Sequence, residues 1–251
     1  MTHTSRAHSS ESYPNRYPTS RRKPQPYGPA VVALCVVFGV VFAAEAYADG
    51  GSLWRISVST LGWLGGNAPK LTIGDNQWWR LVTAGLMHGG LLHIGFNVYA
   101  MLMVGSAVER AIGPGWVVGA FVFSAITGNL LSASANAPNI VAIGASGGIF
   151  GLVAMAAAMS YLAPRLAWFH RGVLTQMLVF SLAIGFVAGF DNWGHIGGVV
   201  GGALCALIAV ACRRQPDTFR LIGKIGGAAG LVTAVVCVAL AIMSLSRVRA
   251  E

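Results

Sequence analysis

The chain has 251 residues, of which 55% are hydrophobic and only 10% are charged, and its mean hydropathy is +0.65. Soluble domains contain about 25% charged residues, so this composition excludes an ordinary soluble protein and indicates a polytopic membrane protein. The formal net charge of +9 does not indicate nucleic-acid binding, because the basic residues gather in short segments beside apolar runs, where they set topology. We therefore expect the lipid bilayer, and no nucleic acid, as a partner.

The N-terminal part of the chain divides into a polar tail and a first apolar run. Residues 1–28 are rich in Ser, Pro, Tyr, Arg and His without apolar periodicity, which predicts a disordered basic cytoplasmic tail. Residues 30–48 are apolar and long enough to cross a bilayer. This run ends in Ala46-Tyr47-Ala48, which is similar to a signal-peptidase site, so a cleaved signal peptide is an alternative. The long leader and the length of the run favour a membrane span.

Seven membrane spans are predicted, and a long outer loop separates the first from the others. Residues 49–85 are mixed in polarity, and their tryptophans suit a loop that lies partly in the headgroup region. Six later runs each have about the length that crosses a bilayer. They cover residues 89–108, 115–134, 146–163, 173–190, 195–212 and 226–245. We expect an all-α polytopic membrane protein with a six-span core at 29–212, and a seventh helix with a short tail at 226–251.

The placement of basic residues predicts the orientation of these spans. The segment 213–225 is basic and joins the last two runs, whereas the loops 135–145 and 190–194 contain no Lys or Arg. Cytoplasmic loops carry an excess of Lys and Arg, so we expect 213–225 to be a cytoplasmic loop and the N-terminus to be cytoplasmic. Basic residues in 49–85 and in the C-terminal tail weaken this pattern. The prediction is a multi-pass protein of the cell membrane.

The four cysteines lie in or at the end of apolar runs and lack the spacing of metal ligands. We interpret them as small packing residues, and we expect no disulfide, metal site or cofactor. They are Cys35, Cys205, Cys212 and Cys237.

Polar residues inside apolar runs are costly in lipid, so each requires a reason. Ser146 stands where a glycine-rich outer loop becomes the fourth predicted span, between Gly144 and Gly147. The first turn of a helix has free N–H groups and a positive dipole end, which can stabilise an oxyanion beside a serine hydroxyl. The alternative is that this segment is only a packing face of small residues.

His195, at the start of the sixth predicted span, favours a catalytic interpretation of Ser146. A serine hydroxyl needs a base to take its proton, and histidine is the usual base near neutral pH. Gly198 and Gly202 lie on one helix face, and Gly147 and Gly151 have the same spacing on the fourth span. Two such faces can pack with their backbones nearly touching, which would bring Ser146 to His195. A structural histidine bonded to a backbone carbonyl is the alternative.

His93 and Asn97 have the spacing that places both on one face of the second predicted span. Both side chains can donate hydrogen bonds, and a tetrahedral intermediate needs donors aimed at its oxygen. The alternative is a polar clasp between helices. Under the predicted topology all three polar clusters lie near the outer ends of their spans, where a cavity open to the outside would admit water.

In order and spacing, these clusters resemble the motifs of the rhomboid family of intramembrane serine proteases, over about residues 78–202. The glycine-rich segment resembles the family's Gly-x-Ser-Gly, and the second span resembles its His-x-x-x-Asn. The position of Phe150 resembles an aromatic position that packs against the catalytic histidine in the family. The matching residues are His88, His93, Asn97, Gly144, Ser146, Gly147, Phe150, His195, Gly198 and Gly202, with the pair Trp79-Arg80 in the long loop.

The resemblance implies a rhomboid-like six-helix bundle with one additional C-terminal transmembrane helix. It implies that Ser146 is the nucleophile and His195 the general base, with His93, Asn97 and a backbone N–H stabilising the oxyanion. The implied reaction is hydrolysis of peptide bonds in or near the transmembrane segments of other membrane proteins, at a site that opens toward the outer face. Gly194 departs from the family pattern, which often has alanine there.

Two other functions remain as alternatives at this point. The first is a non-catalytic rhomboid-like protein that binds membrane helices; such relatives usually lack the serine or the histidine, and both are present here. The second is a transporter or channel, which would need a polar path through the whole bilayer. The inner halves of the predicted spans are almost wholly apolar, which disfavours it. The sequence does not indicate an oligomeric state.

Overall fold

The structure, a computed structural model, describes residues 27–163, 171–188 and 190–248. Most of the predicted tail at 1–28 lies outside these residues, so its disorder stays a prediction. The regular secondary structure of these residues is helical, apart from one isolated antiparallel bridge between Asn67 and Ala142. The elements are α1 (Pro29–Ala48), α2 (Val58–Leu64), the π-helix η1 (Lys70–Gly74), α3 (Arg80–Thr83), the 3₁₀-helix η2 (Ala84–Leu86), α4 (Leu91–Ala100), the π-helix η3 (Met101–Gly105), α5 (Ser106–Ile112), α6 (Pro114–Ala135), α7 (Ser146–Leu162), α8 (Arg171–Ala188), α9 (Asn192–Cys212) and α10 (Pro216–Val248).

The predicted all-α membrane architecture is confirmed. In the described part of the chain, five helical segments are long and apolar enough to cross a membrane. They are Pro29–Ala48, Leu91–Ile112, Pro114–Ala135, Asn192–Cys212 and Pro216–Leu245. The apolar helices Ser146–Leu162 and Arg171–Ala183 occupy the fourth and fifth predicted spans but are shorter, so crossing by these two stays a prediction.

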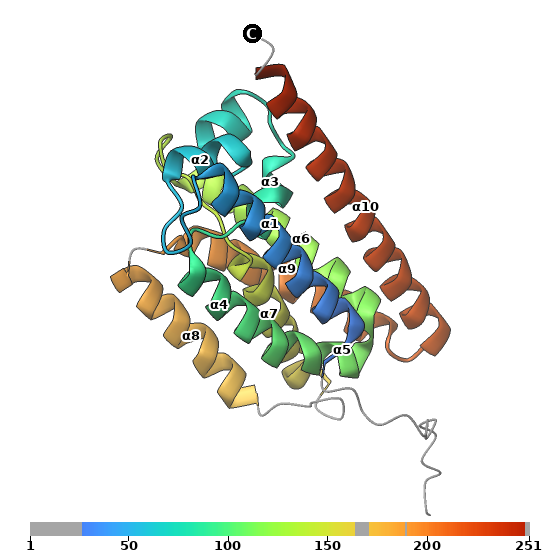
Figure 1. Cartoon of the computed structure of the whole chain (residues 1–251). Coiled ribbons are helices and arrows are strands. Elements are labelled where there is room, and N and C mark those ends of the chain that lie inside the picture. Colours follow the sequence, from blue (N-terminus) through green and yellow to red (C-terminus); the bar gives the residue numbers. More distant parts are fainter. Residues whose placement is uncertain (1–26, 164–170, 189, 249–251) are drawn as a thin grey trace, which may run out of the picture.

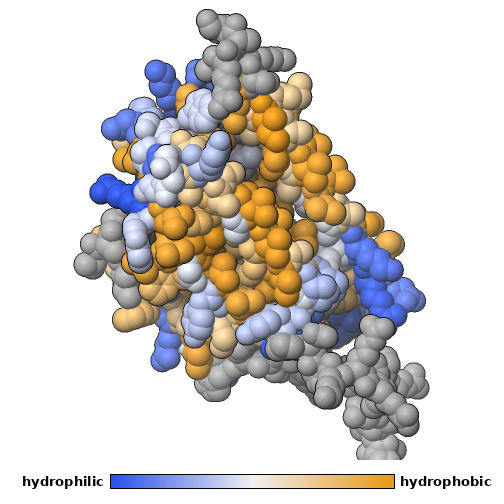
Figure 2. Space-filling view, in the orientation of Figure 1, coloured by the Kyte–Doolittle hydropathy of each residue, from blue (hydrophilic) through white to orange (hydrophobic). Residues whose placement is uncertain are grey.

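The surface agrees with a lipid environment. Many large apolar side chains are exposed, among them Val40 of α1 at 65% and Phe96 of α4 at 73%, and apolar exposure on this scale marks a surface that contacts lipid. Figure 2 shows hydrophobic residues across the middle of one face, with hydrophilic residues toward its upper left and lower right. This distribution is that of a protein whose middle lies in hydrocarbon and whose ends lie in water.

Two boundaries differ from the sequence-based predictions. The predicted loop at 213–225 is helical from Pro216, because proline favours the first turn of a helix and Asp217 complements its dipole. The second predicted span does not end at residue 108 but continues through η3 and α5 to Ile112. Its central turn is a π-helix, a local widening that hydropathy does not reveal.

The helices that carry Ser146 and His195 lie at the centre of the bundle. Helix α9 packs against both α6 and α7, and α6 also packs against α7 and α10 (Figure 1). Helices α1 and α4 lie in front of this centre in Figure 1, and α8 lies along α7. The close approach of α7 to α9 therefore occurs in the interior of the molecule and not at its lipid-facing surface.

A buried carboxylate fixes the beginning of α1. The Glu109 side chain of α5 is 5% exposed and accepts hydrogen bonds from the N–H groups of Ala30 and Val31, at 3.0 and 2.9 Å. These N–H groups belong to the first turn of α1 and have no partner within that helix. The carboxylate satisfies them and complements the positive end of the helix dipole.

The predicted outer loop at 49–85 is structured, and Arg80 is its central contact. Arg80 Nη1 donates to the carbonyl oxygens of Gly62 and Gly66, at 2.6 and 2.8 Å, and Nε donates to Gln77 Oε1 at 2.7 Å. The guanidinium also lies 4.6 Å from the ring centroid of Trp79. Burial lowers the pKa of Arg80 to about 10, so the side chain stays charged at neutral pH. Arg80 thus joins separate parts of the loop to one another.

Replacing Arg80 with lysine is expected to destabilise this loop. Lysine cannot donate to the carbonyls of Gly62 and Gly66 and to Gln77 with the geometry of a guanidinium. We expect a loss of about 2 kcal/mol in the free energy of unfolding, since hydrogen bonds to a buried charged group are lost. Thermal denaturation in detergent measures this effect, with Arg55→Lys in the exposed part of the loop as the control. Equal melting temperatures for the two variants would contradict the role of Arg80.

Candidate active site

The loop before α7 brings the serine to the start of that helix. Gly144 has a φ of +128°, a backbone conformation that residues with a side chain rarely adopt. Its N–H donates to the carbonyl oxygen of Ala84 at 2.9 Å. Helix α7 then begins at Ser146, which is partly buried. The serine hydroxyl therefore lies in the first helical turn, beside N–H groups that have no acceptor within the helix.

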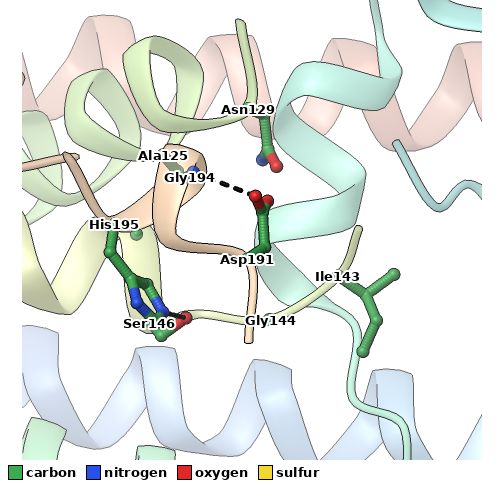
Figure 3. A pocket seen from close by; sticks show the side chains of 9 residues that line it. Ala125, Asn129, Ile143, Gly144, Ser146, Asp191, Gly194 and His195 are labelled. Carbon is green, nitrogen blue, oxygen red and sulfur yellow. Dashed lines mark hydrogen bonds between the residues drawn. The ribbon is translucent and has the colours of Figure 1, made fainter. Parts of the chain in front are cut away.

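The histidine lies at the equivalent place on α9. The Asp191 side chain caps this helix by accepting the N–H of Gly194 at 3.2 Å, and it also accepts from Asn136 Nδ2 at 3.0 Å. His195 follows in the first turn and is 7% exposed. Its Nε2 lies 2.9 Å from Ser146 Oγ, a hydrogen-bonding distance (Figure 3). The structure thus brings together the two side chains that the sequence analysis paired.

The two helices can approach this closely because glycines face each other between them. A Cβ atom added to Gly198 would overlap the carbonyl oxygen of Gly147, and one added to Gly202 would overlap the carbonyl oxygen of Gly151. The predicted contact between the two glycine faces is therefore present. Backbone-to-backbone packing of this kind holds the first turns of α7 and α9 at a fixed separation.

Phe150 stacks on the imidazole of His195. The two rings lie with centroids 4.2 Å apart and planes 5° from parallel. Phe150 is one turn after Ser146, so the same helix that carries the hydroxyl also holds the histidine ring in place. In the described part of the chain, His195 Nδ1 has no hydrogen-bond partner. We therefore infer that the Phe150 ring, and not a hydrogen bond to Nδ1, orients the imidazole of His195.

Under the catalytic role that the sequence predicts for His195, replacing Phe150 with alanine is expected to lower turnover. A stacked aromatic pair contributes about 0.5–1.5 kcal/mol, and its loss would let the His195 ring rotate away from Ser146. We expect kcat for a model membrane substrate to fall about tenfold with little change in KM. Phe150→Tyr keeps the stacked ring and should retain kcat. An alanine variant that turns over like the tyrosine variant would show that stacking does not hold the ring.

His93 reaches the same place from α4. Its Nδ1 accepts the N–H of Gly89 at 3.3 Å, which leaves the ring proton on Nε2. A Cβ atom added to Gly144 would lie 2.8 Å from His93 Nε2 and 3.5 Å from Ser146 Oγ, so the Nε2–H group lies beside the serine. The structure thus brings His93 near Ser146, and its role as an oxyanion donor stays a prediction.

Asn97 and His88 have partners of other kinds. Asn97 is 6% exposed, and its Nδ2 donates within α4 to the carbonyl oxygen of His93 at 2.9 Å. The ring of His88 is fully buried and packs edge-on against His93, with centroids 5.3 Å apart. Its backbone N–H donates to the carboxylate of Glu45. Asn97 thus braces the helix turn that carries His93, and its role as an oxyanion donor stays a prediction.

A small polar cavity adjoins the serine and the histidine. Its volume is about 20 Å³. Figure 3 shows the side chains that line it. Its lining consists of Ala125, Asn129, Ile143, Gly144, Ser146, Gly147, Asp191, Gly194 and His195. This volume is large enough to hold a water molecule.

The sequence analysis did not identify two residues near this site. Asn129 lines the cavity from α6, and its Nδ2 donates to the carbonyl oxygen of Leu81 at 2.9 Å. Glu45 contacts the turn before α4 from α1. Each is a strongly polar side chain inside a predicted span, and that signal alone could have singled out both.

Helical membrane architecture with a serine and a histidine at hydrogen-bonding distance is typical of an intramembrane hydrolase. The rhomboid domain family matches residues 75–212, more than half of the chain. The chain belongs to the rhomboid family. The matched segment contains every residue of the predicted site, from His88 to Gly202, and leaves α1 and α10 outside.

Several curated proteins are similar to this chain. GluP, a rhomboid protease of Bacillus subtilis (strain 168), is 38% identical over 139 residues, which cover 53% of this chain and 26% of GluP. YdcA of the same bacterium, provisionally named a rhomboid protease, is 29% identical over 182 residues, 72% of this chain and 86% of YdcA. Inactive RHOMBOID-like protein 8 of Arabidopsis thaliana is 30% identical over 149 residues, 57% of this chain and 42% of that protein. The chain thus spans about a quarter of GluP, and the family includes a member named inactive.

Proposed function

We propose that this protein is an intramembrane serine endopeptidase that cuts other membrane proteins in or near their transmembrane segments. The observation that carries the proposal is the distance of 2.9 Å between His195 Nε2 and Ser146 Oγ. Relatives named rhomboid proteases support the same class of reaction. Membership of the family alone would not suffice, because one relative is named inactive.

The proposed reaction begins with the transfer of the serine proton. His195 Nε2 takes the proton from Ser146 Oγ as the oxygen attacks the carbonyl carbon of the scissile peptide bond. The carbonyl electron pair moves to its oxygen and forms a tetrahedral oxyanion. We propose that the Nε2–H of His93 and the free N–H groups at the start of α7 stabilise this charge, which their positions near Ser146 support. Asn97 is a further proposed donor.

The intermediate then collapses and releases the first product. The C–N bond breaks, and the histidinium returns the proton to the leaving amine, which leaves an acyl ester on Ser146. A water molecule attacks this ester while His195 takes one of its protons. The bond between the acyl carbon and Ser146 Oγ then breaks, the histidinium returns the proton to Oγ, and the second product leaves as a carboxylic acid that ionises in water. The cavity beside the two side chains gives water a place to enter. We place this cavity at the outer end of the bundle and the N-terminus in the cytoplasm, on the basis of the charge pattern.

The substrate has to present an extended backbone to this site. A helical carbonyl is already hydrogen-bonded and shielded by its own helix, so the segment that is cut must unwind. Transmembrane segments with glycine, proline or other weak helix formers unwind at lower cost. We therefore propose such segments of other membrane proteins as the substrate class.

A fluorophosphonate probe tests the proposal in detergent-solubilised or reconstituted protein. The expected result is covalent labelling that peptide mass spectrometry maps to Ser146, with cleavage of a model transmembrane substrate by the same preparation. Ser146→Ala should lose both signals. A folded wild-type protein that neither reacts with the probe nor cuts any of several model substrates would instead favour the alternative, a non-catalytic rhomboid-like protein that binds membrane helices.

A further inference from the structure

Glu45 is the one charged side chain of α1, and the proposed dyad does not use it. It lies one turn before the end of this apolar helix and is 1% exposed. A carboxylate inside a membrane span is destabilising unless it has partners, and such residues generally serve a function. Its contacts therefore indicate what it does.

The carboxylate holds the turn that precedes α4. Its two oxygens accept the backbone N–H of His88 at 3.2 and 3.1 Å. The next N–H along the chain, that of Gly89, donates to Nδ1 of His93 at 3.3 Å. Two successive amide groups are thus held, the first by Glu45 and the second by the imidazole ring. Once the first peptide unit is fixed, only the φ and ψ of His88 decide the direction of the second, because each planar peptide unit moves as one rigid body.

The direction of the Gly89 N–H favours one tautomer and one orientation of the His93 ring. A neutral imidazole that accepts at Nδ1 carries its proton on Nε2, and Nε2 is the nitrogen that lies beside Gly144 and Ser146. If the Gly89 N–H turned away, His93 could rotate or change tautomer and would then present a lone pair to the oxyanion. A lone pair repels that charge, whereas an N–H stabilises it.

We propose that Glu45 is a positioning residue that keeps the His93 Nε2–H directed at the oxyanion. This role rests on the proposed function, because it requires that His93 stabilises a tetrahedral intermediate. Glu45 acts through the backbone of His88 and Gly89 and does not touch the substrate. The link joins α1, which lies outside the segment matched to the family, to the reacting atoms.

The chain contains a matched control for this carboxylate. Glu109 is also buried, and its two oxygens also accept backbone N–H groups at the beginning of a helical segment. It binds the first turn of α1, whereas Glu45 binds near the opposite end of that helix. The hydrogen bonds of the Glu109 carboxylate go to Ala30 and Val31 and not to the turn before α4. Replacing either carboxylate removes a comparable structural contact, but only Glu45 adjoins the proposed site.

The first experiment compares substitutions that keep or remove the acceptor. Glu45→Gln keeps a carbonyl oxygen that can accept the N–H of His88, whereas Glu45→Met keeps the length of the side chain without an acceptor. We expect Glu45→Met to lower kcat by about tenfold to a hundredfold with little change in KM, since misplacing a catalytic group has effects of this size. Glu45→Gln should restore most of kcat. Glu109→Met should lower the melting temperature but retain kcat per folded molecule.

A double-mutant cycle with His93→Ala separates positioning from a structural role. If Glu45 acts through His93, Glu45→Met should cause no further loss of kcat in the His93→Ala background. A loss of the same factor in both backgrounds would overturn the proposal. Equal kcat for Glu45→Met and the wild type would also overturn it.

A measurement without catalysis keeps this test independent of the proposed function. Nitrogen-15 spectra of labelled histidine in detergent distinguish the two neutral tautomers of His93, assigned with His93→Ala. We expect protonated Nε2 in the wild type and in Glu45→Gln, and a mixture in Glu45→Met. An unchanged tautomer in Glu45→Met would overturn the positioning role even if the enzyme is active. An inactive wild type with the expected tautomers would overturn only the proposed function.

Discussion

Ser146→Ala, His195→Ala and the double variant are all expected to lose peptidase activity to the same floor, by a factor on the order of 10⁴ or more. The expectation follows from the hydrogen-bonding distance between the two side chains. Without the hydroxyl there is no nucleophile for the base to activate, and without the base the hydroxyl stays protonated. Residues that act as one unit therefore show strongly non-additive losses.

The measurement is kcat/KM for a model transmembrane substrate in liposomes, with folding of each variant checked by circular dichroism. Ser160→Ala is a matched control, because Ser160 is buried in the same helix and its hydroxyl donates to the carbonyl oxygen of Ala156. This control should keep the wild-type rate. If the double variant were slower than either single variant by the product of their factors, Ser146 and His195 would be acting independently and the dyad would be wrong.

The helical membrane fold was predictable because the bilayer restricts the alternatives. A chain in hydrocarbon must pair its backbone groups within each segment, so long apolar runs become helices whatever their detailed composition. Hydropathy does not encode how a helix begins or widens. Helix α10 begins at Pro216, inside the predicted basic loop. The π-helix η3 (Met101–Gly105) lies within the second span, where the hydropathy does not indicate it. Such features depend on local backbone geometry and not on average polarity.

The site was predictable where chemistry and spacing coincided within one helix. Ser146 and His195 each open an apolar run beside glycines, and the spacing of those glycines along the chain is enough to predict that the two helices approach closely. The polarity of Glu45 inside an apolar run could have singled it out, but its role could not be predicted. Its partner is a backbone N–H in the turn before α4, and no spacing along the chain records which turn a carboxylate will contact. Contacts to backbone groups become visible only when the helices are placed in space.

Gly202→Ala is expected to abolish most activity and to lower stability, although the change adds a single methyl group far along α9 from His195. A Cβ atom at this position would overlap backbone atoms of Gly151, and backbone cannot move aside as the end of a flexible side chain can. Helices α7 and α9 would have to separate, at a loss of about 1–3 kcal/mol in the free energy of unfolding. Separation also lengthens the distance between Ser146 and His195, and a shift of about 1 Å lowers turnover by about a hundredfold.

Gly39→Ala is the control for this substitution. Gly39 lies in α1, and a Cβ atom added there meets no atom within 4 Å. The same methyl group should therefore leave activity unchanged, and it should raise the melting temperature slightly because alanine favours helix more than glycine does, by up to about 1 kcal/mol. Thermal denaturation and kcat/KM, measured on both variants, give the comparison. Wild-type activity in Gly202→Ala would mean that α7 and α9 do not touch at Gly202, and that another contact sets the distance between Ser146 and His195. Loss of activity in Gly202→Ala but not in Gly39→Ala would show that the glycine contact sets this distance, because the two substitutions differ only in what the added methyl group meets.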